Sequence, residues 1–470
     1  MKTTTTLWLL AALLWLGGAL ALPAAAQTFP VDTLVKTGPL ARRINLVFVP
    51  DGYQASEMPL FRSRVTQVLN SLFAQTPFLE YRSYFNAFAI EVPSAQSGTT
   101  HPRTAPDCGT VQPFAATTYF NSTFDFGGIH RLLVPRGNAA LGAVLTRNFP
   151  SYDQVFILVN SPEYGGSGGQ FATASANASA TEIMVHEIGH SFGGLADEYW
   201  AGPQYARETT NMTQTTDPAT VRWAPWMGTS GIGIFPHSTD PSWKKPHPRC
   251  KMQFLGDPFC AVCREAFVEK FHTLVRPLQA YAPTGLAING PTQDLPFALT
   301  LLPPAPNTVR ITWTRNGTVF ARNTAATTVP LAQLPVGTHV VRAVVTDTTA
   351  LTRRASHTTL HSYTVDWTIT RTATGVSMAS STAEYEVETF PNPFGEVLNL
   401  SYTLPRPAPV VLTVTDAAGR TVKTIRYARQ LPGRYQYQLR PGELGVRAAG
   451  MYTLLLDVDG IVTSRQLLKE

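Results

Sequence analysis

The chain has 470 residues, of which 44% are hydrophobic and 14% are charged. This length corresponds to about three domains of ordinary size. The formal net charge is +6, and the lysines and arginines are scattered along the chain without a long basic run. This distribution argues against a nucleic-acid-binding surface, and we expect no nucleic-acid partner.

Residues 1–26 have the three parts of a secretory signal peptide. Lys2 supplies the positive charge, an apolar run extends from Leu7 to Leu22, and small residues precede Gln27. The apolar run is shorter than the ~20 residues of a membrane-spanning helix, and no other segment qualifies. We therefore expect a protein that is secreted or held at the cell surface, exported through the Sec pathway and without a membrane span.

Residues 27–280 alternate apolar strand-like runs with helical stretches, which is typical of an α/β domain. The expected strands are residues 44–49, 87–92, 131–134 and 155–160, and the expected helices are residues 57–73 and 181–192.

The second of these helices carries the motif HEIGHSFGGLADEY at residues 186–199. Positions i and i+4 lie on one face of a helix, so His186 and His190 can turn their imidazoles toward one point, as zinc ligands do. Glu187 can then act as general base on a water molecule. The alternative interpretation is a helix with two surface histidines and a solvated glutamate.

A catalytic zinc ion needs a third protein ligand and one open position. Gly193 and Gly194 can end the helix and turn the chain back toward the histidines. The third histidine of the common metzincin pattern would fall at Ala196. We therefore predict Asp197 as the third ligand, with Glu198 next in order and Glu208 or a more distant group last.

The motif HEIGHSFGGLADEY is similar to the zinc signature of the IgA-peptidase family of metalloendopeptidases, family 64 of the metallopeptidases. The resemblance spans about residues 40–275 and includes three further segments: INLVFVPDGY (44–53), DQVFILVNSPEYGGSGG (153–169) and CKMQFLGDPFCAVCREAF (250–267). It implies a zinc endopeptidase of metzincin type, with an α/β metzincin-like catalytic domain in which His186, His190 and Asp197 bind Zn²⁺.

The same resemblance implies that Met252 forms the hydrophobic floor beneath the zinc ligands, the Met-turn of metzincins. Some metzincins have a tyrosine two residues after this methionine, where this chain has Phe254. Tyr199 is a candidate substitute, although packing is the simpler role for it. Residues 165–173 are expected to border a cleft in which an extended peptide binds at the sheet edge.

The chain has four cysteines, Cys108, Cys250, Cys260 and Cys263. An even number in an exported protein favours two disulfides, with the pairing open. The alternative is a structural zinc site, since Cys260 and Cys263 have the spacing of a zinc-binding pair and Cys250 and Cys108 could complete it.

After residue 280 the sequence predicts two small all-β sandwich domains. Residues 281–371 form the first, an Ig-like sandwich with strands at residues 308–315, 339–347 and 361–370. Residues 372–389 are small and polar and are typical of a linker. Residues 390–470 form the second sandwich, with turns such as residues 416–419 between its strands.

Residues 390–470 resemble the C-terminal sorting domain of the type IX secretion system of Bacteroidetes. The segment Pro391-Asn392-Pro393-Phe394 at its start and the penultimate Lys469 carry the resemblance. It implies that the type IX machinery is a partner and that this domain takes no part in catalysis. The alternative is a carbohydrate-binding or adhesive sandwich.

Together these features predict a secreted zinc endopeptidase that acts on a polypeptide substrate, with Glu187 as its general base. The alternative from another class is a surface adhesin or binding protein built on an inactive metzincin scaffold. The presence of all four motif residues favours the enzyme, and an esterase or amidase with the same zinc site is a further alternative. The substrate, the cleavage site and the oligomeric state are left open by the sequence.

Overall fold

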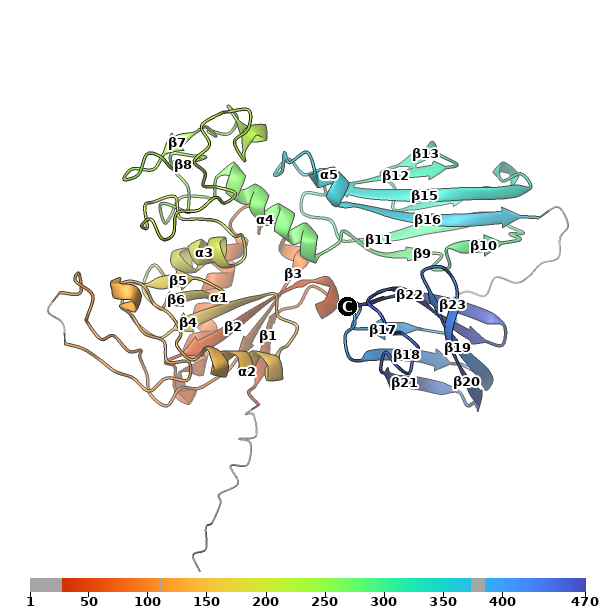
Figure 1. Cartoon of the computed structure of the whole chain (residues 1–470), viewed down its shortest axis with the longest axis horizontal. Helices are drawn as coiled ribbons and strands as arrows, with labels where there is room; N and C mark the ends of the chain where they lie inside the picture. The colour runs from red at the N-terminus through yellow and green to blue at the C-terminus, as the bar shows by residue number, and fades with distance from the viewer. Residues whose placement is uncertain (1–27, 110–111, 373–384) are drawn as a thin grey trace, which may run out of the picture. The chain divides into compact units, whose positions relative to one another are not determined.

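The computed structural model describes residues 28–109, 112–372 and 385–470. The predicted signal peptide and most of the predicted linker lie outside these ranges. The chain divides between Lys270 and Phe271 into two compact units. It is mostly β, with several sheets and few helices (Figure 1). Within the described ranges, every helix is too short or too polar to cross a membrane.

The first unit contains a six-stranded sheet with the strand order β1-β3-β2-β4-β6-β5. The inner strands β3, β2, β4 and β6 are parallel, and the edge strands β1 and β5 are antiparallel to their neighbours. The strands are β1 (Val31–Val35), β2 (Ile44–Asp51), β3 (Phe85–Ile90), β4 (Gln154–Val159), β5 (Gly166–Gly168) and β6 (Ala172–Ser175). The same unit contains a short hairpin of β7 (Phe235–Pro236) and β8 (Lys244–Lys245).

Helices cover both faces of this sheet. The longer helices are α1 (Met58–Phe73), α2 (Asn138–Asn148), α3 (Ala180–Ser191) and α4 (Ala261–Leu274), and the chain passes into the second unit within α4. Val47 and Ile157 share a core with Leu141 of α2. On the other face, Phe85 packs edge-on against Phe73 of α1, with ring centroids 5.7 Å apart. Covering both faces explains why β2, β3 and β4 are buried along their whole length.

Between β3 and α2, the described residues 91–109 and 112–137 have little regular structure. The strand predicted at residues 131–134 is wrong, because Leu132 and Val134 form only isolated bridges, to Gly166 and Thr123. A run of apolar residues predicts burial, but backbone pairing here changes partner after two residues. The short 3-10 helix η4 (Phe126–Gly128) is the one helix in the described part of this connection.

Asp51, at the end of β2, fastens this connection to the sheet. Its carboxylate is fully buried and accepts hydrogen bonds from the backbone amides of Phe120 (3.0 Å) and Ser122 (2.9 Å) and from the hydroxyl of Thr118 (3.0 Å). Gly52 follows with φ +73°, and a Cβ there would lie 1.9 Å from the carbonyl oxygen of Gly98. The Asp-Gly pair therefore both turns the chain and holds the loop.

The described part of the second unit is built mainly of antiparallel strands. A five-stranded sheet (β10-β16-β15-β12-β13) and a three-stranded sheet (β14-β11-β9) contribute to one core, in which Trp313 and Trp367 stack 5.8 Å apart. Their elements are β9 (Leu278–Ala282), β10 (Ala287–Asn289), β11 (Leu295–Leu301), β12 (Val309–Arg315), β13 (Thr318–Arg322), β14 (Ala326–Val329), β15 (Gly337–Asp347), α5 (His357–Leu360) and β16 (Ser362–Arg371).

The last part of the chain has a core of its own, made by residues 385–467. Tyr385 and Val387 are buried in that core, so it begins before residue 390, where the sequence placed its start. Its sheets have the orders β17-β18-β21 and β20-β19-β22-β23. The strands are β17 (Glu388–Phe390), β18 (Leu398–Leu404), β19 (Ala408–Asp416), β20 (Thr421–Gln430), β21 (Gly433–Leu439), β22 (Gly450–Val458) and β23 (Ile461–Lys469).

We predict that Asp51→Ala loosens the connection between β3 and α2. The substitution leaves the buried backbone amides of Phe120 and Ser122 without a hydrogen-bond acceptor. The free energy of unfolding of the first unit should therefore fall by about 2–4 kcal/mol. Hydrogen exchange measured by mass spectrometry should show faster exchange across residues 118–123. Asp32→Ala is the matched control, because Asp32 forms only a partly exposed ion pair with Arg62. Unchanged exchange in Asp51→Ala would contradict the anchoring role.

Candidate active site

Helix α3 places the two motif histidines side by side. Residues 183–189 of this helix are all buried, so it runs through the interior of the first unit. The helix ends at Ser191, and Gly194 takes φ +63°, a left-handed conformation that suits glycine. The chain then returns along the helix and brings Asp197 to His186 and His190.

The three side chains meet in a nearly equilateral triangle. His186 Nε2 and His190 Nε2 are 3.2 Å apart, and Asp197 Oδ1 lies 3.1 Å and 3.2 Å from them. The Nδ1 atom of His186 lies 2.9 Å from the carbonyl oxygen of Lys251, and that of His190 lies 2.8 Å from the carbonyl oxygen of Leu195. Donation to these carbonyls fixes the proton on Nδ1 and leaves Nε2 as the metal-binding atom.

This donor set fits a zinc ion. Zinc lies about 2.0–2.2 Å from imidazole nitrogen and carboxylate oxygen, which gives edges of roughly 3.3–3.5 Å for a tetrahedral site. Burial lowers the pKa of His190, but the hydrogen bond to the Asp197 carboxylate and its charge outweigh this effect and raise that pKa to about 9. Binding a cation here therefore displaces a proton, as zinc does at other histidine sites.

Glu187 lies beside the triangle without joining it. Its Oε2 atom is 4.0 Å from His190 Nε2. Burial raises the pKa of Glu187, while the neighbouring histidines act in the opposite direction. Two glycines of β5 make room for this carboxylate, since a Cβ on Gly168 would lie 2.6 Å from Oε2 and one on Gly166 would lie 3.2 Å from Oε1.

The other carboxylates considered as third ligands lie elsewhere. Glu198 points away from the histidines, and its Oε1 accepts hydrogen bonds from Asn211 (3.1 Å) and from the thiol of Cys263 (3.4 Å). Burial raises the pKa of Glu198 well above its usual range. Glu208 pairs with Arg222 at 2.9 Å. The structure thus brings Asp197, and neither alternative, to the histidine pair.

Asn211 is a positioning residue that the sequence analysis missed. Its fully buried amide accepts a hydrogen bond from the Ala196 backbone amide (2.8 Å) and donates one to the Ala196 carbonyl (2.8 Å). It therefore pairs with the residue before Asp197 much as a strand would. A lone asparagine in a polar stretch carries no sequence signal for such a role.

Met252 packs against helix α3 at Gly189, which lies between the two histidines in the sequence. Met252 is fully buried, and a Cβ on Gly189 would lie 2.5 Å from its sulfur. The Met252 carbonyl accepts a hydrogen bond from the Glu198 amide (2.8 Å), so this turn also steadies the segment that carries Asp197.

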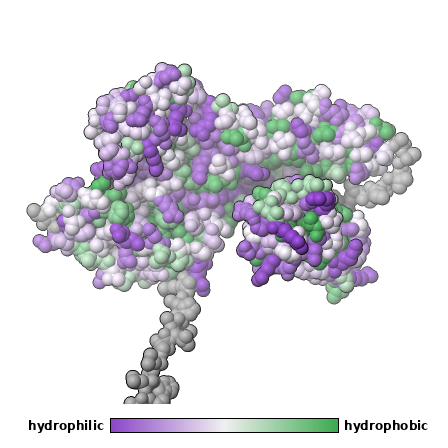
Figure 2. Space-filling view, viewed as in Figure 1, coloured by the Kyte–Doolittle hydropathy of each residue, from purple (hydrophilic) through white to green (hydrophobic). Residues whose placement is uncertain are grey.

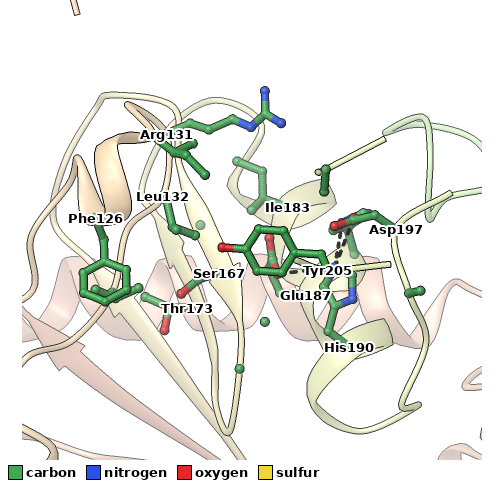
Figure 3. A pocket seen from close by; sticks show the side chains of 18 of the residues that line it. Phe126, Arg131, Leu132, Ser167, Thr173, Ile183, Glu187, His190, Asp197 and Tyr205 are labelled. Carbon is green, nitrogen blue, oxygen red and sulfur yellow. Dashed lines mark hydrogen bonds and ion pairs between the residues drawn. The ribbon is translucent and has the colours of Figure 1, made fainter. Parts of the chain in front are cut away.

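A cleft of about 1050 Å³ opens over these residues. In Figure 3, Glu187, His190 and Asp197 lie on one side of the cleft, and Phe126 and Leu132 lie on the other. Most of residues 166–173 line it, as expected for this segment. Tyr199 also lines it, with its ring under the Arg131 guanidinium (5.5 Å). Phe254 is outside the lining and contacts Arg249 instead.

Segment 131–133 covers part of the outer edge of β5. The Gly166 amide donates to the Arg131 carbonyl (3.1 Å), and the Gly166 carbonyl accepts from the Leu133 amide (3.3 Å). A bound peptide therefore cannot pair with the backbone of Gly166. Residues Ser167–Phe171, which follow it, still line the cleft.

The two predicted disulfides are not formed, because all four cysteines are free. Cys108 is surrounded by His101, Asp125 and His130, apart from the other three. Cys250 and Cys260 lie 3.7 Å and 3.6 Å from Cys263, well beyond the ~2.05 Å of a disulfide. The alternative of a zinc site made by all four cysteines is also wrong, because Cys108 does not belong to it. Glu198 lies with Cys250, Cys260 and Cys263 in one buried cluster instead.

The first unit resembles a known peptidase family in sequence. Residues 33–240, a little under half of the chain, match the family IgA Peptidase M64. The matched range contains His186, Glu187, His190 and Asp197. The match supports a peptidase, and the M64 peptidases are metallopeptidases. No curated protein matches the chain.

Among solved structures, the similarities are remote. Dimeric latent PorU from Porphyromonas gingivalis is 14% identical, with a TM-score of 0.19, over 41% of this chain and 20% of that one. A β-glucuronidase from Parabacteroides merdae is 9% identical, with a TM-score of 0.17, over 48% of this chain and 29% of that one. This chain thus spans less than a third of either protein, and at these TM-scores neither similarity bears on the fold or function.

Alanine substitutions at two helical glycines should change stability in opposite directions, because only one of the glycines packs against Met252. Gly189→Ala should lower the thermal unfolding temperature of the first unit, because its Cβ must displace a buried sulfur. Gly142→Ala on α2 is the matched control, since its Cβ would meet nothing within 4 Å. That change should stabilise the unit by about 0.5–1 kcal/mol. Equal shifts in calorimetry would contradict the proposed packing.

Proposed function

We propose that the protein is a secreted zinc-dependent endopeptidase of metzincin type. The observation that carries this proposal is the triangle of His186, His190 and Asp197, with a buried glutamate beside it and an open cleft above it. His186 and His190 would hold zinc through Nε2 and Asp197 through Oδ1, leaving one position open toward the cleft. When bound, zinc supplies Lewis-acid chemistry, which acidifies a water molecule and polarises a carbonyl oxygen.

Glu187 carries out the proton transfers in this proposal. Its carboxylate takes the proton of the attacking water and then delivers it to the leaving amine. Burial favours the protonated form of Glu187, which helps it to hold that proton between the two steps. The charges of His186 and His190, and to a smaller extent that of Arg131, oppose the effect of burial on the pKa of Glu187.

The cleft fits an extended polypeptide. Ser167–Phe171 provides backbone groups beyond the part of β5 that segment 131–133 covers, and peptides commonly bind by pairing with such groups. Tyr164 and Tyr205 also line the cleft, and each is nearly half exposed. These aromatic rings offer apolar surface for substrate side chains. The adhesin alternative does not explain why a buried carboxylate is held beside three converging ligand atoms.

Glu187→Gln tests the proposed base. The amide has the same shape but cannot accept the proton, so turnover of a casein substrate should fall about 10²–10⁴-fold. The zinc content should stay at the wild-type level, because Glu187 is not a ligand. Unchanged turnover would sink the mechanism, and equal loss of zinc and activity would make Glu187 part of the metal site instead.

The third ligand is tested by a matched pair of neighbouring substitutions. In Asp197→Asn, the free zinc concentration that gives half-maximal activity should rise at least ~100-fold. Loss of a residue that only hydrogen-bonds to a ligand weakens metal binding about 10–100-fold, and loss of a ligand itself should weaken it more. Glu198→Gln should change this concentration much less, because its carboxylate faces the cysteines. The reverse order would assign the ligand role to Glu198.

We further propose that residues 385–470 direct export through the type IX machinery. This part has a core of its own, so its removal should leave the rest of the chain folded. A chain ending at Thr372 should cleave peptides in vitro but stay inside the cell envelope of a type IX-competent bacterium. Fractionation of cells expressing both forms checks this expectation. Equal amounts in the medium would contradict the sorting role.

A further inference from the structure

We propose that His101, Cys108, Asp125 and His130 form a second metal site, which binds one structural zinc ion. All four belong to the connection between β3 and α2, and none is shared with the proposed catalytic site. Metal binding here does not depend on the catalytic proposal, whereas the effect of this metal on KM rests on the proposed peptidase activity. It concerns a site whose role is to hold the wall of the cleft.

The four ligand atoms lie at the corners of a compact tetrahedron, and all six of its edges are short. His101 Nε2 lies 3.1 Å from Asp125 Oδ1, 3.2 Å from His130 Nδ1 and 3.8 Å from Cys108 Sγ. Cys108 Sγ lies 3.1 Å from Asp125 Oδ1 and 2.8 Å from His130 Nδ1. The last edge, from His130 Nδ1 to Asp125 Oδ1, is 3.5 Å. A tetrahedral zinc site with these donors has edges of roughly 3.3–3.6 Å.

With a neutral His101, hydrogen bonds alone do not account for this convergence. Glu163 Oε2 lies 2.9 Å from His101 Nδ1, and its charge favours a proton on that nitrogen. With the proton there, His101 Nε2 presents a lone pair to the Asp125 carboxylate. The thiol of Cys108 can satisfy only one of the facing acceptors. A cation at the centre turns the remaining lone-pair repulsions into attractions, so the geometry favours a bound metal ion.

The ligands are also held in place from behind. Asp125 Oδ2 accepts a hydrogen bond from the Thr104 amide at 2.7 Å, which leaves Oδ1 for the metal. The ring of His101 stacks on Phe124 with centroids 4.6 Å apart and an interplanar angle of 16°. The Glu163 carboxylate lies behind His101, where carboxylates are common at zinc sites.

The donor set selects the metal and its role. Imidazole, thiolate and carboxylate ligands in tetrahedral order are typical of zinc. Four protein ligands fill the coordination sphere, which marks a structural site rather than a catalytic one. His101, Cys108 and Asp125 are buried, with exposures of 2%, 7% and 7%.

The position of the site suggests what it does for the enzyme. Asp125 and His130 bracket a turn whose Phe126 and Ile129 line the cleft, and Arg131 follows directly. Figure 3 shows Phe126 and Leu132 on this wall. The described part of the connection has little regular structure to hold it, so a metal ion bound to both ends of the turn would fix the wall. Loss of the ion should therefore raise KM more than it lowers kcat.

Zinc content per chain tests the proposal in the full-length protein. Cys108→Ser and Asp125→Asn should each contain about one zinc ion fewer than the wild type after dialysis in zinc-free buffer, measured by mass spectrometry of the metal. Asp107→Asn is the matched control, because Asp107 is exposed, is next to Cys108 and is not a ligand. It should retain the wild-type content. Because variants are compared with the wild type, zinc at other sites cancels.

The two zinc proposals fail in distinguishable ways. His190→Ala should lose its own equivalent, and the double variant with Cys108→Ser should lose two. If His190→Ala loses none while Cys108→Ser loses one, the catalytic proposal fails and this one stands. Equal zinc in Cys108→Ser, Asp125→Asn and the wild type overturns the second site. Circular dichroism identifies a variant that fails to fold. If a variant fails to fold, anomalous diffraction at the zinc edge from wild-type crystals tests the proposal instead. We expect an anomalous peak among the four ligand atoms, and its absence would overturn the proposal.

Discussion

The candidate active site depends on two backbone carbonyls, those of Lys251 and Leu195. Each accepts the Nδ1 proton of one histidine, so both Nε2 atoms face Asp197 and are the atoms left to bind a metal ion. One carbonyl comes from the turn before Met252 and the other from the turn after α3, so the histidine tautomers are set by two separate chain segments. A local disturbance of either turn would reach the metal-binding atoms without touching a ligand.

The sheet contributes to the site by placing β5, two of whose three residues are glycines, next to α3. Gly166 and Gly168 let β5 approach the helix so closely that the backbone forms one wall around Glu187. The parallel strands and Asp51 then hold the long connection whose far end returns to β5 at Arg131 and Leu133. The proposed base, the proposed metal ligands and the cleft wall are thus parts of one packed edge of the first unit.

The sequence predicted the centre of this arrangement better than its surroundings. Helical spacing and the glycines after α3 were enough to group His186, His190 and Asp197, because those relations are local. Strands β2, β3, β4, β12, β15 and β16 were found near their observed bounds, since apolar runs and alternation mark them directly.

Most of the failures concern relations between distant segments. Cys108 was grouped with the other cysteines by type, whereas the fold places it among His101, Asp125 and His130, none of which stands out in the sequence. Asn211 acts through backbone pairing, which leaves no residue pattern. Helix α2 was missed because only Leu141, Val144 and Leu145 form its buried stripe. Residues 131–134 are apolar enough for a strand, but their backbone partners change along the segment.

Asp197 and Glu198 are consecutive, yet their side chains enter opposite environments, one facing the histidines and the other the cysteines. This alternation is that of an extended chain, in which a shift of one residue exchanges the two faces. The site therefore depends more on the number of residues between Gly194 and Asn211 than on which residues they are. A single-residue insertion or deletion just before Asp197 would send the wrong carboxylate to each side, while many substitutions on the outer surface of the same loop would leave both sides intact.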